Sequence, residues 1–121
     1  MPHGVRGTAV SGDAMRRVAA DLSKQAATLV PRASQVVRKV ALDTEADAKA
    51  LAPVDTGMLR NSITTAVTGD GLRAAVVATA SYAPYVELGT SRQAPQPFMG
   101  PATVRNKPLF EEAMRHLAEG G

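Results

Sequence analysis

The chain has 121 residues, of which 45% are hydrophobic but only 3% aromatic, and it contains neither cysteine nor tryptophan. This length predicts one domain with a modest core, and the lack of cysteine excludes disulfides and thiolate metal sites. The net charge is only +3, and no more than two basic residues are adjacent, which disfavours direct nucleic-acid recognition.

Residues 1–10 contain Pro2, Gly4 and Gly7 and are expected to form a flexible arm. We expect residues 11–119 to form a single domain. Most of its apolar residues are alanine and valine, and a core of such small side chains suggests that stability depends on association with other subunits.

From Ser11 onward, apolar residues recur at steps of three and four, which predicts an amphipathic helix of about forty residues. The stripe consists of Met15, Val18, Leu22, Ala26, Leu29, Ala33, Val36, Val37 and Val40, and Ala48 and Leu51 extend it. Ser11 or Asp13 can cap its start, Pro53 ends it, and Pro31 predicts a kink or a break into two helices. A helix this long cannot bury its whole stripe on one small domain, so we expect part of it to face a partner.

A turn and a β-hairpin are predicted next. Asp55 and Gly57 favour a turn over residues 54–57, with a positive φ at Gly57. Residues 63–67 and 72–79 are rich in Val, Thr and Ile, and the TGDG sequence at 68–71 between them is typical of a hairpin.

Two further helices complete an expected α+β fold with a small antiparallel sheet. Ser81 can cap a short helix that ends at Gly89, and the segment TSRQAPQPFMG (90–100) is expected to be extended and polyproline-like. Pro101 suits the first position of a C-terminal helix, whose strong part is expected to start close to Pro108.

Candidates for catalysis are few. Asp55, Thr56 and Gly57 form the DTG tripeptide of aspartic proteases, but it occurs once and follows a helix, which favours the turn. Glu87 lies among apolar neighbours and could act as a general acid with a raised pKa. A hydrolase centred on Asp55 or Glu87 is therefore a weaker alternative. The chain has two histidines, no cysteine and no phosphate-binding loop. We therefore expect that the protein is not an enzyme and has no catalytic residue, and that it binds neither a metal nor a cofactor.

Three blocks in a fixed order, APVDTGMLRNSI (52–63), YAPYVELGT (82–90) and QPFMGPA (96–102), resemble the small tail-component family of long-tailed, siphovirus-type bacteriophages. Its members are described as tail completion, neck or head–tail joining proteins. The matching positions are Asp55, Thr56, Gly57, Leu59, Ser62 and Ile63, then Tyr82, Ala83, Tyr85, Val86, Glu87, Gly89 and Thr90, then Pro97, Phe98, Pro101 and Ala102. Leu88 stands where the family often has Phe, and Gly100 where a basic residue is frequent.

The resemblance implies a non-enzymatic virion protein with a fold similar to that of phage tail terminators. It would be made in the bacterial cytoplasm and assemble as a ring, expected to be a hexamer, at the head–tail junction. Its partners would be copies of itself, the head-closure or connector protein, the tail terminator and the tail tube. DNA would pass through the lumen without specific recognition, and no membrane would be involved.

Within that family we expect structural and interface roles for several residues. Met58, Leu59, Tyr82, Tyr85, Val86 and Phe98 would anchor the core or a subunit boundary. Gly57 and Gly89 would adopt positive φ, and Glu87 would fix the neighbouring loop through charge-assisted hydrogen bonds. Residues 92–99, including Arg92 and Pro97, would form an arm presented to a neighbour.

The alternative from a different class is a nucleic-acid-binding accessory module. It would use the basic residues of the long helix, namely Arg16, Arg17, Lys24, Arg38 and Lys39.

Overall fold

The computed structural model describes residues 11–53 and 57–120, so the expected N-terminal arm and Asp55 lie outside the described residues. The chain divides into two compact units, residues 1–30 and residues 31–121. We call them the N-terminal unit and the C-terminal unit and describe each by itself.

Helix α1 (Gly12–Leu51) contributes to both units. Its start is capped as expected, because the Ser11 hydroxyl oxygen accepts a hydrogen bond from the backbone N–H of Ala14 at 3.1 Å. It ends two residues before Pro53, also as expected. The predicted alternative of two separate helices is wrong, since α1 continues through Pro31. Pro31 removes one donor, and the carbonyl it would have reached belongs to the exposed Ala27, which solvent can satisfy. A kink at Pro31 would change how the two units are arranged, so the expected kink stays a prediction.

In the N-terminal unit the described residues form only the first part of α1. Every described side chain there is exposed except that of Ala14, which is half-buried. The exposed residues include five large apolar ones, Met15, Val18, Leu22, Leu29 and Val30. The described part of this unit therefore has an amphipathic helix but no core of its own.

The C-terminal unit contains the predicted hairpin, with β1 (Ile63–Val67) antiparallel to β2 (Ala74–Ala78). Ile63 is paired with Ala78 and Val67 with Ala74. The second strand begins at Ala74 instead of residue 72 because Leu72 belongs to the turn. The Asp70 carboxylate accepts a hydrogen bond from the backbone N–H of Leu72 at 3.0 Å. Alternate residues of each strand are covered, which is the pattern of a sheet with one face against helices.

Three more helices, α2 (Met58–Asn61), α3 (Ala83–Leu88) and α4 (Met99–Ala118), complete the unit. The expected Ser81 cap is wrong, since Tyr82 occupies the N-cap of α3 and makes no side-chain capping bond. In α4 Pro101 is the third residue rather than the first, and Pro108 lies inside the helix instead of near its start. Pro108 is tolerated there because it and Val104, whose carbonyl it leaves without a donor, are both exposed to solvent.

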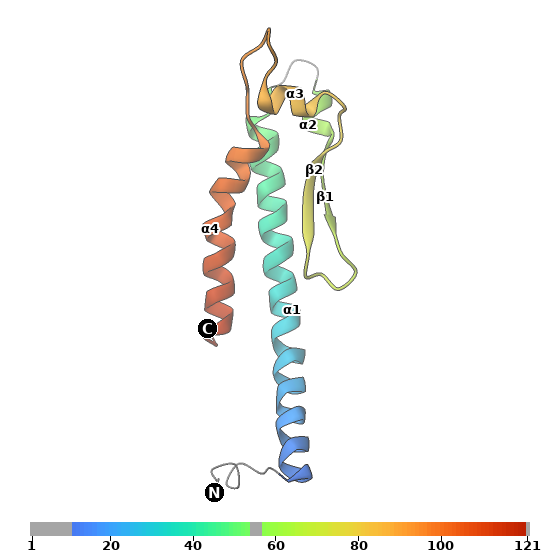
Figure 1. Cartoon of the computed structure of the whole chain (residues 1–121), viewed down its shortest axis with the longest axis vertical. Helices are drawn as coiled ribbons and strands as arrows, with labels where there is room; N and C mark the ends of the chain where they lie inside the picture. The colour runs from blue at the N-terminus through green and yellow to red at the C-terminus, as the bar shows by residue number, and fades with distance from the viewer. Residues whose placement is uncertain (1–10, 54–56, 121) are drawn as a thin grey trace, which may run out of the picture. The chain divides into compact units, whose positions relative to one another are not determined.

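The core of the C-terminal unit lies where the end of α1, the start of β1, α3 and the start of α4 meet. In Figure 1 the hairpin and α4 flank the second half of α1 on opposite sides. The fully covered cluster is Ala48, Ala52, Leu59, Ile63, Ala83, Phe98 and Ala102. Phe98, at 0% exposure, is its largest side chain, and four alanines around it let the helices approach closely. No helix within residues 11–53 and 57–120 is long and apolar enough to cross a membrane.

Candidate functional site

The carboxylate of Glu87, in the last turn of α3, caps the start of α4. Its Oε1 accepts the backbone N–H groups of Phe98 at 3.1 Å and Met99 at 2.9 Å, and its Oε2 accepts that of Gly100 at 3.0 Å. The next residue, Pro101, has no N–H to satisfy. Because a helix leaves its first four donors without an internal partner, this one side chain satisfies all three that exist here.

Two opposing effects act on the pKa of Glu87. Partial burial raises the pKa, but the three backbone hydrogen bonds from Met99, Phe98 and Gly100 together lower it more, so that it lies below the ordinary 4.5. The raised pKa that a general acid would need is therefore not found. The negative charge also faces the positive end of the α4 dipole, which stabilises the same junction.

The turn after α3 depends on Gly89. Its φ of 79° and ψ of 175° belong to a region that essentially only glycine adopts. A Cβ at this position would lie 2.8 Å from the backbone nitrogen of Pro95 and 2.9 Å from the Gln93 carbonyl oxygen. Gly57, the N-cap of α2, also has the expected positive φ of 79°.

The loop between α3 and α4 folds back on itself instead of running as a free extended arm. The backbones of Thr90 and Gln93 exchange hydrogen bonds, and the Thr90 hydroxyl accepts from the N–H groups of Arg92 and Gln93. Gln96 donates to the carbonyl of Val86 at 2.8 Å, which anchors the returning limb on α3. In Figure 1 the loop projects away from α3 and from the start of α4.

The expected arm over residues 92–99 is therefore shorter than predicted, and its contact with a neighbour stays a prediction. Residues 92–97, with Arg92 and Pro97, are exposed. Phe98, however, is completely buried in the core, and Met99 is already the first residue of α4. The sequence leaves Phe98 either a core or a boundary position, and its burial beside Ala48 and Ala102 makes it a core residue.

The other proposed anchor residues fall into two groups. Leu59 is buried and Val86 is partly buried against the core. The side chains of Tyr82, Tyr85 and Met58 are 38%, 63% and 63% exposed, and that of Leu88 is 76% exposed. Tyr82 is the N-cap of α3, and Tyr85 and Leu88 lie within this helix. These exposed side chains, spaced three residues apart, are available to another molecule.

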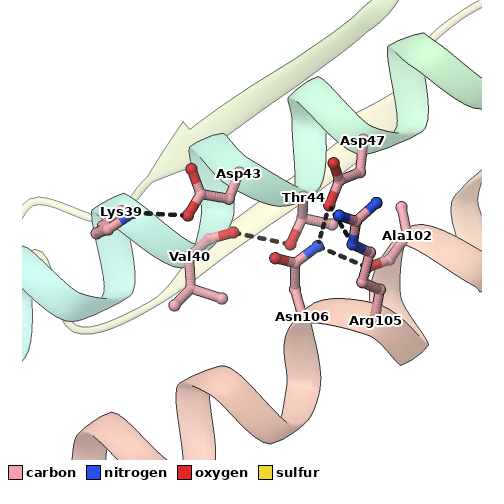
Figure 2. Close-up of polar contacts among 8 residues, drawn as sticks. All are labelled: Lys39, Val40, Asp43, Thr44, Asp47, Ala102, Arg105 and Asn106. Carbon is pink, nitrogen blue, oxygen red and sulfur yellow. Dashed lines mark hydrogen bonds and ion pairs between the residues drawn. The ribbon is translucent and has the colours of Figure 1, made fainter.

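A polar network that the sequence did not predict joins α1 to α4 (Figure 2). Asn106 is only 3% exposed, and its amide nitrogen donates to the Asp47 carboxylate and to the Ala102 carbonyl, both at 2.8 Å. Arg105 lies 3.8 Å from the same Asp47 oxygen. The buried Thr44 hydroxyl donates to the Val40 carbonyl in its own helix at 2.7 Å. No local signal in the sequence marks this network, because Asp47 and Asn106 lie 59 positions apart.

Two further contacts hold α1 to the elements that follow it. Arg60 donates to the carbonyl of Lys49 at 3.2 Å, which satisfies one of the last carbonyls of α1. Glu45 accepts the Thr65 hydroxyl of β1 at 2.7 Å and pairs with Lys49 at 3.2 Å. The Thr65 and Lys49 hydrogen bonds lower the pKa of Glu45, against a smaller opposing effect of burial.

The residues of the nucleic-acid alternative do not form a uniformly basic face. Arg16 pairs with Asp13 at 3.0 Å, and Lys39 pairs with Asp43 at 2.8 Å. No group of three or more acidic or histidine side chains that could hold a metal ion occurs within residues 11–53 and 57–120. Asp55, the other catalytic candidate, lies outside the described residues.

The long helix, the hairpin and the Glu87-capped junction define a small α+β protein in which the side chains of Arg60, Glu87 and Asn106 join its own elements. Its large exposed apolar faces are typical of proteins that bind other proteins. The chain belongs to the HK97-gp10-like family of bacteriophage tail components: the family model described as "Bacteriophage HK97-gp10, putative tail-component" matches residues 12–89. No curated protein and no solved structure matches the chain. A tail component is part of the virion and contacts other structural proteins of the phage.

Proposed function

We propose that this tail component is a purely structural protein, without catalytic activity, that forms a ring at the head–tail junction. The ring would complete the tail and connect it to the head. A hexamer is expected by resemblance, with the head-closure protein, tail terminator and tail tube as neighbours and DNA passing through the lumen. The observation that carries this proposal is the uncovered apolar stripe of the N-terminal unit.

The stripe leaves several large apolar side chains exposed to water, as interaction sites do. Met15, Val18 and Leu22 are 57%, 52% and 60% exposed, and Leu29 and Val30 are 39% and 41% exposed. Full burial of one such side chain contributes about 1.5–3 kcal/mol, so covering the remaining area stabilises an assembly by on the order of 5 kcal/mol per copy. A single amphipathic helix is also marginal in water by itself.

A closed ring further requires two different complementary patches on each subunit. The N-terminal stripe supplies one patch. The complement of the stripe is a different surface of the C-terminal unit. The exposed side chains of Tyr82, Tyr85 and Leu88, on and beside α3, form a further apolar surface there that is open to a neighbouring protein. Tyrosine and methionine are enriched in protein–protein interfaces, and tyrosine is frequent among the residues that dominate binding energy.

The test introduces charges on the stripe and on the opposite side of the same helix. The variant Val18→Glu/Leu22→Glu places two carboxylates in the stripe. The matched control Ala20→Glu/Ala27→Glu places two on the exposed far side. We expect the stripe variant to lose ring formation by light scattering and to leave tails unjoined to heads in electron micrographs of infected-cell lysates. The control should still form rings, and its tails should still be joined to heads.

Rings or joined particles that persist in the stripe variant would contradict the proposal. The same holds if electron microscopy of the wild-type particle places the chain away from the neck.

A further inference from the structure

A groove on the C-terminal unit has the chemistry to receive an amphipathic helix. Its floor is the second half of α1, with Val37, Val40, Ala41 and Thr44. Its walls are the hairpin, with Leu72, Arg73, Ala74 and Val76, and α4, with Thr103 and Phe110. Its volume of about 490 Å³ holds several side chains. Apart from Arg73 and two threonines, the lining is aliphatic or aromatic.

We propose that the helical segment 12–30 of a second copy of this chain lies in this groove. The inference rests on the proposed ring and names the contact that would build it. An amphipathic helix whose apolar face enters a hydrophobic groove is a recurring mode of recognition. The segment presents Met15, Val18, Leu22 and Leu29 on one face over roughly 21 Å, at the 1.5 Å rise of a helix.

Charge complementarity supports this occupant. Arg73 is the one charged residue of the lining, and its guanidinium makes no ion pair within the described part of the chain. Asp21 lies three residues after Val18, at the edge of the stripe, and its carboxylate is likewise unpaired among the described residues. A helix seated with its stripe in the groove brings a carboxylate to the rim where a cation is available.

A second copy fits better than the same chain's own segment. Residues 31–36 are helical and lead directly to Val37 on the groove floor. The chain's own segment could enter the groove only if α1 broke and reversed within those few residues, which would sacrifice several helical hydrogen bonds. A segment from another copy needs no such break.

The contact joins two different surfaces, the stripe of one copy and the groove of the next. Such a heterologous contact leaves one free stripe at one end of a row of copies and one free groove at the other end, until the row closes on itself. Where the rotation between neighbours closes, as the proposed ring requires, this contact builds a ring rather than a symmetric dimer.

The chain has no natural cysteine, which allows a clean cross-linking test with the full-length protein. Leu22→Cys and Val40→Cys are made as separate proteins, mixed, and treated with a short bismaleimide. We expect the mixed Leu22→Cys/Val40→Cys product to be the main cross-linked species. A matched control, Lys24→Cys on the polar side of the segment, should lose that product. If Val40→Cys disturbs folding, Thr103→Cys on the exposed wall replaces it.

A chain carrying both Leu22→Cys and Val40→Cys tests how the contact propagates. We expect a ladder of cross-linked species that extends beyond the dimer. A ladder that stops at the dimer would overturn the head-to-tail arrangement. A link formed within one chain at high dilution would show that the groove takes its own segment.

The failures of this inference and of the proposed function are distinguishable. Rings that form without the mixed product would overturn the groove contact and leave the ring function standing. If the mixed product forms but the phage neck contains no ring of this protein, the groove contact stands and the proposed ring function is overturned. Equal yields with Lys24→Cys and Leu22→Cys would show nonspecific collision and also overturn the contact.

Discussion

The two halves of α1 carry the same periodic apolar pattern but have opposite surroundings. From Met15 to Val30 the large apolar side chains are 39–60% exposed. In the second half, Val37, Ala41 and Ala48 are 8%, 7% and 0% exposed. The pattern that makes both halves helical is therefore not what determines whether they are covered.

The difference follows from what else the chain supplies. The hairpin, α3 and α4 all follow Pro53, and the hydrogen bonds that α1 makes with the elements after Pro53 involve its second half. Thr65 bonds Glu45, Arg60 bonds Lys49 and Asn106 bonds Asp47. The N-terminal unit has no such elements among its described residues. A stripe without a covering element in its own unit is the expected signature of a segment that is completed by another molecule.

The largest effect is expected in the covered region. Phe98→Ala removes the biggest side chain of the core, at 0% exposure, and should lower the free energy of unfolding by about 3–5 kcal/mol. Urea unfolding followed by circular dichroism measures the loss. The exposed Val104→Ala in α4 is the control and should change little. If Phe98→Ala lowers the free energy of unfolding no more than Val104→Ala does, Phe98 is not at the centre of the core.

The turn at Gly89 gives the next largest effect. Gly89→Ala forces a side chain into a glycine-only conformation and against the backbone of Pro95, and we expect a loss of about 2–3 kcal/mol or more. Gly69→Ala is the matched control, because nothing lies within 4 Å of its Cβ position. Thermal unfolding of both variants against the wild type measures the difference. Equal melting temperatures for the two variants would contradict the argument.

The capping carboxylate should have a smaller, pH-dependent effect. Glu87→Gln keeps the shape of the side chain but replaces one acceptor oxygen by an NH2 group, which faces the backbone N–H donors at the start of α4. The substitution should lower the free energy of unfolding by about 1–2 kcal/mol at pH 7. Because the folded-state pKa lies below the ordinary 4.5, the contribution of Glu87 is present above that value. It is lost as the pH falls below 4.5 through the folded pKa.

Unfolding curves of the wild type and Glu87→Gln between pH 7 and acid measure this effect. The two stabilities should converge as the pH falls. Other carboxylates with lowered pKa, Glu45 and Asp70, affect both proteins equally, so the difference isolates Glu87. A gap that widens in acid would overturn this assignment.

Local signals in the sequence were sufficient for most elements. The step of three and four predicted α1, Ser11 and Pro53 predicted its ends, and the TGDG turn predicted the hairpin. These features depend on residues close together along the chain. The start of α4 was placed wrongly because its cap, Glu87, comes from 11 residues before Phe98, and no local pattern reveals such a distant partner.

Site residues with an unusual local sequence could be predicted, whereas those whose role depends on distant residues could not. Glu87 and Gly89 stood out as a charged residue among apolar ones and as a turn former. The Asp47–Asn106 contact spans 59 positions, and its two residues look like ordinary surface polar groups in a helical pattern. Phe98 was assigned to an arm as well as to an anchor because burial depends on Ala48 and Ala102, which the local sequence does not bring together.

The smallest effect on folding, and the one that decides the comparison, is expected in the N-terminal unit. Leu22→Ala removes a side chain that is 60% exposed, so in dilute protein it should change the free energy of unfolding by less than about 0.5 kcal/mol. At concentrations where subunits associate, the same substitution should lower the apparent stability more, because binding to the folded state stabilises it by mass action. Unfolding curves over a range of protein concentrations measure both regimes, with Lys24→Ala on the polar side as control. A Leu22→Ala effect that is large when dilute and independent of concentration would mean that the stripe is covered within one chain, and the two halves of α1 would then no longer differ.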